Sequence, residues 1–235
     1  MKEMRYVYKE KAAKNMVGKY SLVIPVIIIF GIITSGISTL TTSYRPKYEV
    51  DWNTFERTLV DPGNPSMVFL FGIFAFVVGA IIYYATTKMF IQTANDEMPV
   101  IEDILVVGLK DNPFRSIVLQ FLIDLFVFLW ALLFIIPGIV KSYAYSMSFY
   151  LAQRKPELAA NEALDLSKKI TRGYKMDLFI LDFSYLGWYF IGLFTFGILW
   201  LWIVPKHMTA RTLYFKEIYE ISFPTPLIID GEIID

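Results

Sequence analysis

The sequence predicts an all-α, polytopic membrane protein in which six transmembrane helices form hairpins, with amphipathic cytoplasmic helices between them. Three observations support this fold class. Hydrophobic residues make up 56% of the 235 residues, mean hydropathy is +0.50, and charged residues make up 19%, against roughly 25% in soluble domains. The chain contains several long apolar runs, and its basic residues are concentrated between particular runs. We therefore treat residues 1–235 as a single integral membrane domain.

The first three spans are predicted directly from apolar runs. Residues 20–40, 67–85 and 114–136 each approach the roughly 20 apolar residues that cross a hydrocarbon core. The first run is longer than a signal-peptide core, and no small-residue cleavage site follows it, so we expect it to remain as an anchor. Residues 41–66 carry charges of both signs with Asn, Pro and Gly, which predicts a solvated outer loop.

The remaining spans are assigned from the distribution of charge. Six basic residues precede the first span and place the N-terminus in the cytoplasm by the positive-inside rule. The basic segment before residue 176 would lie outside unless the chain turns back at Pro137 and Gly138 through residues 139–153. A second turn at Gly197 separates spans 176–194 and 198–215, so both termini are cytoplasmic. With the turn at Pro137 and Gly138, the basic segment from Gln153 to Lys175 is cytoplasmic. Without that turn, seven basic residues would lie outside: Lys141, Arg154, Lys155, Lys168, Lys169, Arg172 and Lys175.

Two segments between spans have the pattern of cytoplasmic amphipathic helices. Residues 99–110 begin at a proline followed by acidic residues, and residues 156–172 do the same and end before Gly173. Each has one apolar stripe, which we expect to lie on the inner leaflet while lysines meet anionic headgroups. The tail 223–235 is acidic and begins with prolines; it is either a docking strand or disordered.

One stretch of the sequence is similar to a known family. It comprises the run from Ile136 through Pro137-Gly138 to Met147, then Pro156, Ser167-Lys168, Gly173-Tyr174-Lys175, Leu181-Asp182 and Gly187-Trp188. This pattern resembles the bacterial integral-membrane family called domain of unknown function nine-seven-five, densely over residues 117–215 and more loosely over the N-terminal 20. A weaker similarity is to the membrane domain of some glycerophosphodiester phosphodiesterases, whose soluble catalytic domain has no counterpart here. The resemblance implies a membrane fold and transfers no catalytic residue.

Two aspartates within predicted spans are the first candidates for function. Asp124 and Asp182 would each cost about 2.5–3.5 kcal/mol at mid-bilayer unless they face a partner or water. Counting residues from the turns places Arg154 at the depth of Asp124, and Arg211 at the depth of Asp182. Each hairpin is therefore expected to carry one aspartate–arginine pair. Such pairs either fix helix register, line a proton or ion pathway, or recognise a lipid headgroup or partner.

A second group of polar residues follows Pro205 in the last span. Lys206 and His207 lie where the proline would kink the helix and free backbone carbonyls. A lone histidine in such a place is more often structural than a pH sensor or ligand-binding group. Because cysteine is absent and His207 is the only histidine, we predict no metal site and no cofactor.

These observations favour a non-enzymatic function. Phosphate-binding loops, zinc-helix motifs and nucleophile elbows are absent from the sequence, so no catalytic residue is predicted. Zero net charge argues against nucleic acid as a partner. We expect a bacterial plasma-membrane accessory, envelope-stress or immunity-type factor that recognises membrane lipids, or another membrane or cytosolic protein. The alternative is a small transporter or channel component that uses Asp124 and Asp182. Small-residue helix faces favour packing within the chain over a homo-oligomer, which stays possible but is not predicted.

Overall fold

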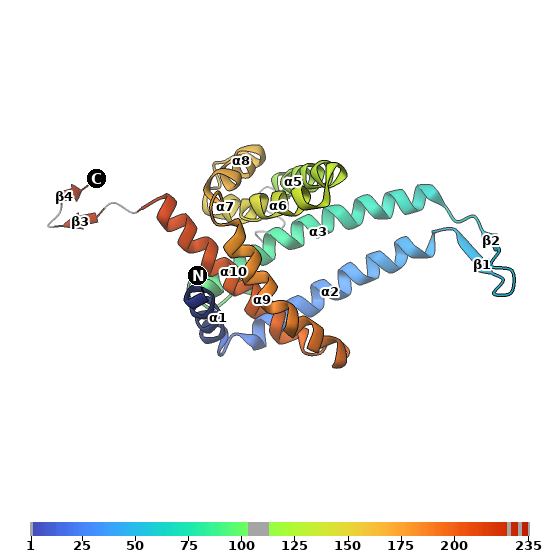
Figure 1. Ribbon diagram of the computed structural model, residues 1–235, viewed down its shortest axis with the longest axis horizontal. Coiled ribbons are helices and arrows are strands. Elements are labelled where there is room, and N and C mark those ends of the chain that lie inside the picture. The colour runs from blue at the N-terminus through green and yellow to red at the C-terminus, as the bar shows by residue number, and fades with distance from the viewer. Residues whose placement is uncertain (1, 103–112, 225–226, 230–231, 235) are drawn as a thin grey trace.

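Helices form most of the described structure, and the long ones lie in antiparallel pairs. The computed structural model describes residues 2–102, 113–224, 227–229 and 232–234. The pairs are α2 with α3, α5 with α6, and α9 with α10 (Figure 1). The helices are α1 (Lys2–Met16), α2 (Tyr20–Ser43), α3 (Pro65–Ala94), α5 (Pro113–Leu133), α6 (Ile135–Tyr145), α7 (Ser148–Arg154), α8 (Ala160–Ile170), α9 (Lys175–Phe194) and α10 (Trp200–Ser222).

Strands occur only as two short antiparallel hairpins in the described residues. Strands β1 (Lys47–Val50) and β2 (Arg57–Asp61) pair at the far tip of the α2–α3 pair, within the predicted outer loop (Figure 1). Strands β3 (Leu227–Ile229) and β4 (Glu232–Ile234) pair in the predicted tail, beyond the end of α10.

Four described helices are long and apolar enough to cross a membrane: α2, α3, α5 and α9. Together they indicate a multi-pass membrane protein. The predicted spans 20–40, 67–85 and 176–194 lie in α2, α3 and α9, whereas 114–136 covers α5 but runs past its end at Leu133 into α6. Predicted span 139–153 is divided between α6 and α7, and 198–215 begins two residues before α10; neither is among the four candidates.

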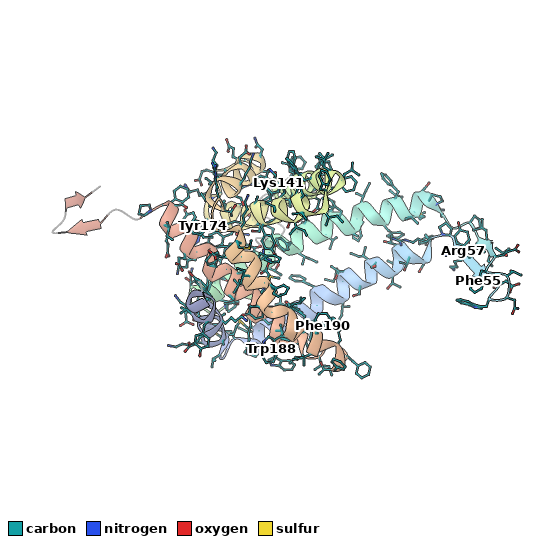
Figure 2. All side chains as sticks on the ribbon, viewed as in Figure 1. Phe55, Arg57, Lys141, Tyr174, Trp188 and Phe190 are labelled. Atoms are coloured by element: carbon teal, nitrogen blue, oxygen red, sulfur yellow. The ribbon has the colours of Figure 1, made fainter. Side chains whose placement is uncertain are left out.

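The surfaces of these helices are apolar and exposed. Only 6–22% of the most apolar window of each candidate span is buried within the protein. Figure 2 shows Trp188 and Phe190 projecting from α9, and they are 53% and 59% exposed. Because exposing many large apolar side chains to water is unfavourable, this surface is better suited to contact with the lipid chains of a membrane.

The core lies around α10, which contacts α1, α2, α3, α8 and α9. Its buried residues include Ala210, Leu213 and Ile218, which pack with Tyr8 of α1 and Leu178 of α9.

Side chains near the start of the chain also hold the end of α3. The Asn15 amide donates to the carbonyls of Thr93 and Ala94, and Lys19 Nζ lies 2.6 Å from an Asp96 carboxylate oxygen. This hydrogen bond and the lysine charge hold the pKa of Asp96 below its ordinary value.

The predicted turn at Pro137 and Gly138 is wrong in position. The helix breaks at Phe134, whose backbone is extended (φ −155°, ψ 142°), and both residues lie in the first turn of α6. A proline is tolerated there because the first-turn N–H groups have no partner within the helix. Gly138 instead permits close packing, since a Cβ on it would lie 2.8 Å from Ala131 Cβ of α5. The other predicted turn lies between α9 and α10, where Gly197 has φ +83°.

The predicted amphipathic helix 156–172 is shorter than expected and lies against protein. It begins at Ala160, where the Glu162 carboxylate accepts a hydrogen bond from the Ala159 N–H (2.8 Å). Its apolar side packs on α5, α6 and α7, and the Ser167 hydroxyl donates to the Ala144 carbonyl at 2.9 Å. The stripe is therefore not free to bury itself in the inner leaflet. Of the predicted helix 99–110, residues 103–110 lie outside the described residues.

Candidate functional site

A cluster of charged and aromatic side chains joins α9 to α10. Asp182 on α9 lies 2.8 Å from His207 Nε2 and 3.5 Å from Arg211 Nε, both on α10. His207 and Arg211 are four residues apart, so they share one face of the helix. The side chains of Asp182, His207 and Arg211 are 18%, 8% and 20% exposed. We call these three residues the Asp182 cluster.

Tyrosines enclose His207 within this cluster. The Tyr189 hydroxyl lies 2.9 Å from His207 Nδ1, and the Tyr185 ring stacks on the imidazole with centroids 4.5 Å apart. The neutral tautomer with a proton on Nε2 satisfies both ring nitrogens, because Nε2–H donates to Asp182 and Nδ1 accepts from Tyr189. This arrangement makes His207 a bridge between the two helices. Tyr143 of α6 also interacts with the Asp182 carboxylate.

A cavity of about 350 Å³ opens beside the Asp182 cluster. We call it the central cavity. Asp182 and Arg211 line it, together with Tyr143 and with Gln120 of α5. The Gln120 amide donates to the Asp124 carboxylate at 2.8 Å. One predicted aspartate therefore reaches the cavity directly, and the other reaches it through Gln120.

The predicted pairing of Asp124 with Arg154 does not occur in the described residues. Asp124 is exposed and accepts a hydrogen bond from Gln120 of its own helix, while Arg154 Nε donates to the Tyr150 hydroxyl at 3.3 Å. The returning helix is broken after Tyr145, and its second part, α7, packs on α3. Counting along one straight helix therefore fails for Arg154. Lys206 is half-buried and makes no hydrogen bond or ion pair with the described residues.

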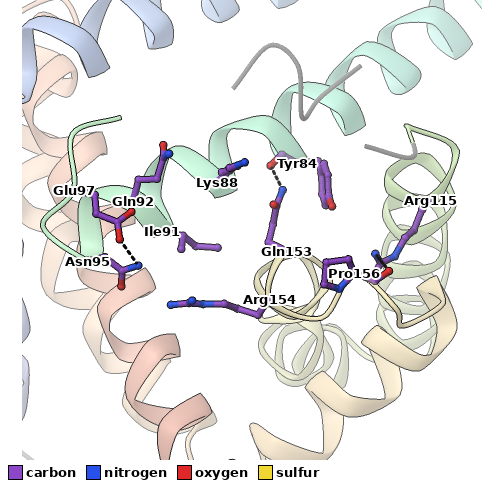
Figure 3. Close-up of a pocket in the computed structure, with 10 residues that line it drawn as sticks. All are labelled: Tyr84, Lys88, Ile91, Gln92, Asn95, Glu97, Arg115, Gln153, Arg154 and Pro156. Carbon is purple, nitrogen blue, oxygen red and sulfur yellow. Dashed lines mark hydrogen bonds between the residues drawn. The ribbon is translucent and has the colours of Figure 1, made fainter. Parts of the chain in front are cut away.

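A second cavity, of about 690 Å³, lies between the ends of α3, α5 and α7 (Figure 3). We call it the basic cavity, because Lys88, Arg115 and Arg154 line it, with Glu97 as the only acidic residue among the described lining residues. Sequence reasoning did not predict this site. One feature of the sequence did point to it, since Lys88 is the only charged residue in the 30 residues of α3. The convergence of the three elements could not be read from the sequence.

Metal binding has no evident site in the described ranges, where no three His, Asp or Glu side chains gather closely enough to hold an ion.

Comparison with known proteins finds a family model that matches part of the chain. Residues 132–222 match the model of the family described as Protein of unknown function (DUF975). No curated protein and no solved structure matches the chain. The comparisons give no support to the similarity with glycerophosphodiester phosphodiesterases.

The DUF975 match covers the helices that build the Asp182 cluster. It begins near the end of α5 and includes α6, α7, α8, α9 and α10, and so contains Asp182, His207, Arg211 and Arg154. Asp124 and the α2–α3 pair lie outside it.

Proposed function

We propose that this chain is a six-span bacterial plasma-membrane protein that works without catalysis, as an accessory factor recognising anionic membrane lipid. Both termini are cytoplasmic in this proposal. The two crossings beyond the four candidate helices are α6 with α7, and α10. Residues 135–154 would form one of these crossings as two helices, with a break after Tyr145 between them. The number of crossings is then even, and the basic start of the chain and the basic segment before α9 lie on the same side.

The observation that carries the lipid proposal is a group of unpaired cations where α8 meets α9. Lys168 and Arg172 interact electrostatically with Lys175. We call these three residues the α8–α9 cationic cluster. None of them forms an ion pair with the described part of the chain. Like charges at the end of an apolar helix repel one another unless anions lie nearby, and anionic headgroups supply about 1 kcal/mol per basic side chain.

The test compares lipids on the purified full-length protein in neutral detergent. Phosphatidylglycerol is expected to raise the unfolding temperature more than phosphatidylcholine does. The variant Lys168→Gln/Arg172→Gln is expected to reduce that difference, whereas Lys47→Gln/Arg57→Gln on the β1–β2 hairpin is expected to leave it intact. Equal stabilisation by the two lipids would contradict the proposal.

A second candidate function is a transporter or channel component, and the central cavity favours it. Asp182 lines that cavity, and Asp124 is bonded to another lining residue, Gln120. The close pairing of Asp182 with His207 and Arg211 leaves its charge neutralised, which suits a register-fixing role better than ion binding. Proton or cation flux into liposomes that is abolished by Asp182→Asn in a correctly folded protein would favour transport.

A further inference from the structure

The basic cavity has the features of a binding site for phosphate groups. Lys88, Arg115 and Arg154 line it, and with Glu97 they give the lining a net charge of +2. No carboxylate of the described residues lies within ion-pairing distance of the three cations. The acidic residue lies at the exposed rim, where the Asn95 amide donates to its carboxylate at 3.3 Å. The cations therefore have no anionic partner from the described chain.

Two buried polar groups in the lining also lack hydrogen-bond partners among the described residues. Arg115 donates through its two Nη atoms to the carbonyls of Pro156 and Lys155, at 2.8 and 3.1 Å, which fixes the guanidinium. Its Nε is buried and has no hydrogen-bond partner in the described part of the chain. The Gln92 side-chain oxygen is likewise buried and unbonded, and rotation of this amide by 180° would present its donor nitrogen instead. Leaving such groups unsatisfied costs about 1–3 kcal/mol each, which an anionic oxygen would recover.

The cations approach the cavity from separate walls. Figure 3 shows Arg154 extending from α7 toward the side of Asn95 and Glu97, while Arg115 lies at the opposite end beside Pro156. Lys88 comes from α3 between them. A ligand with a single small charged group would reach only part of this lining, within a volume of about 690 Å³. A ligand with two phosphate groups can meet the cations on both sides.

We propose that the basic cavity binds a ligand bearing two phosphate groups. Such a ligand is either the headgroup of a two-phosphate lipid of the diphosphatidylglycerol type or a soluble diphosphate. Basic cavities between membrane helices are suited to headgroups of this kind. The cavity shares no residue with the α8–α9 cationic cluster. The two proposed binding sites can therefore be tested independently of each other.

The experiment measures binding of defined probes to the full-length protein in neutral detergent. Native mass spectrometry with diphosphatidylglycerol, phosphatidylglycerol and phosphatidylcholine provides the lipid arm, and thermal stabilisation by inorganic pyrophosphate and inorganic phosphate provides the soluble arm. The test variant is Lys88→Gln/Arg154→Gln. Arg115 is left unchanged, because its hydrogen bonds to Lys155 and Pro156 also hold the backbone. Lys47→Gln/Arg57→Gln on the β1–β2 hairpin removes the same charge elsewhere.

Diphosphatidylglycerol is expected to bind more tightly than phosphatidylglycerol. Its affinity should fall about 30-fold in the test variant, roughly fivefold for each cation removed, and remain unchanged in the control. Stabilisation by pyrophosphate without lipid preference, lost in the same variant, would support the two-phosphate site and assign a soluble source. Undiminished binding of both probes by the test variant would overturn the proposal. So would the absence of any preference for two phosphates in both arms, with diphosphatidylglycerol binding no more tightly than phosphatidylglycerol and pyrophosphate no more tightly than inorganic phosphate.

Discussion

Replacing Asp182 by asparagine is expected to destabilise the protein strongly. The change removes the carboxylate that neutralises Arg211, whose side chain is 20% exposed. The guanidinium is then left with no ion-pair partner in the described residues. Removing one partner of a buried ion pair costs about 3–5 kcal/mol. An asparagine can still accept from His207, and each charged group keeps some solvent access, so the lower end of the range applies, about 3 kcal/mol. For a chain of this size that corresponds to a fall in Tm of about 6–12 °C.

The assay is thermal unfolding of the purified protein in detergent, followed by tryptophan fluorescence. Asp124→Asn is the matched control, because Asp124 is exposed and accepts its hydrogen bond from the uncharged Gln120; its effect should stay within about 0.5 kcal/mol. The variant Asp182→Asn/Arg211→Gln should recover part of the stability, with a coupling of at least about 1 kcal/mol. Equal Tm values for the two asparagine variants, or purely additive effects in the double variant, would refute this reasoning.

Three further predictions concern other contacts. Gly138→Ala should lower stability by about 1–3 kcal/mol, because its Cβ would meet Ala131, whereas Gly187→Ala, with open space at that position, should not; the Tm values of both variants decide this. Tyr189→Phe should cost about 1 kcal/mol by leaving His207 Nδ1 without its donor, measured in the same assay; an unchanged Tm would exclude the bond. The Lys19–Asp96 pair should stabilise the protein at pH values above the ordinary aspartate pKa of about 4, because the carboxylate is then ionised in both the folded and unfolded states. This stabilisation should be lost as the pH falls through the lowered pKa of Asp96 in the folded protein. The Tm difference between wild type and Lys19→Gln should therefore disappear in strong acid, and a pH-independent difference would contradict this origin.

The sequence was most informative where one helix could be considered alone. Long apolar runs predicted the segments that became α2, α3, α5 and α9, because hydrocarbon thickness fixes the length of a span. Counting from the turn at Gly197 brought Asp182 and Arg211 to one depth, and the structure pairs them, because α9 and α10 are continuous over that distance. The part played by His207 depends on side-chain direction and could not be obtained by counting.

Sequence reasoning failed where helices break or where several elements converge. The interruption after Tyr145 redirects Arg154 away from Asp124, and the chain turns at Phe134, a residue with no turn preference, while Gly138 serves helix packing. The basic cavity combines Lys88, Arg115 and Arg154 from three distant segments. Such convergence depends on tertiary packing, which a hydropathy pattern does not encode.

Single cysteines test the proposed membrane arrangement most directly, because the chain contains no native cysteine. Ser43 and Asn161 are both exposed and lie at the end of α2 and in α8 respectively. In intact cells a membrane-impermeant maleimide is expected to label Ser43→Cys but to label Asn161→Cys only after the membrane is opened. Labelling of Asn161→Cys in intact cells would place α8 and its neighbouring cations outside, and would contradict both the six-span topology and recognition of cytoplasmic-leaflet lipid.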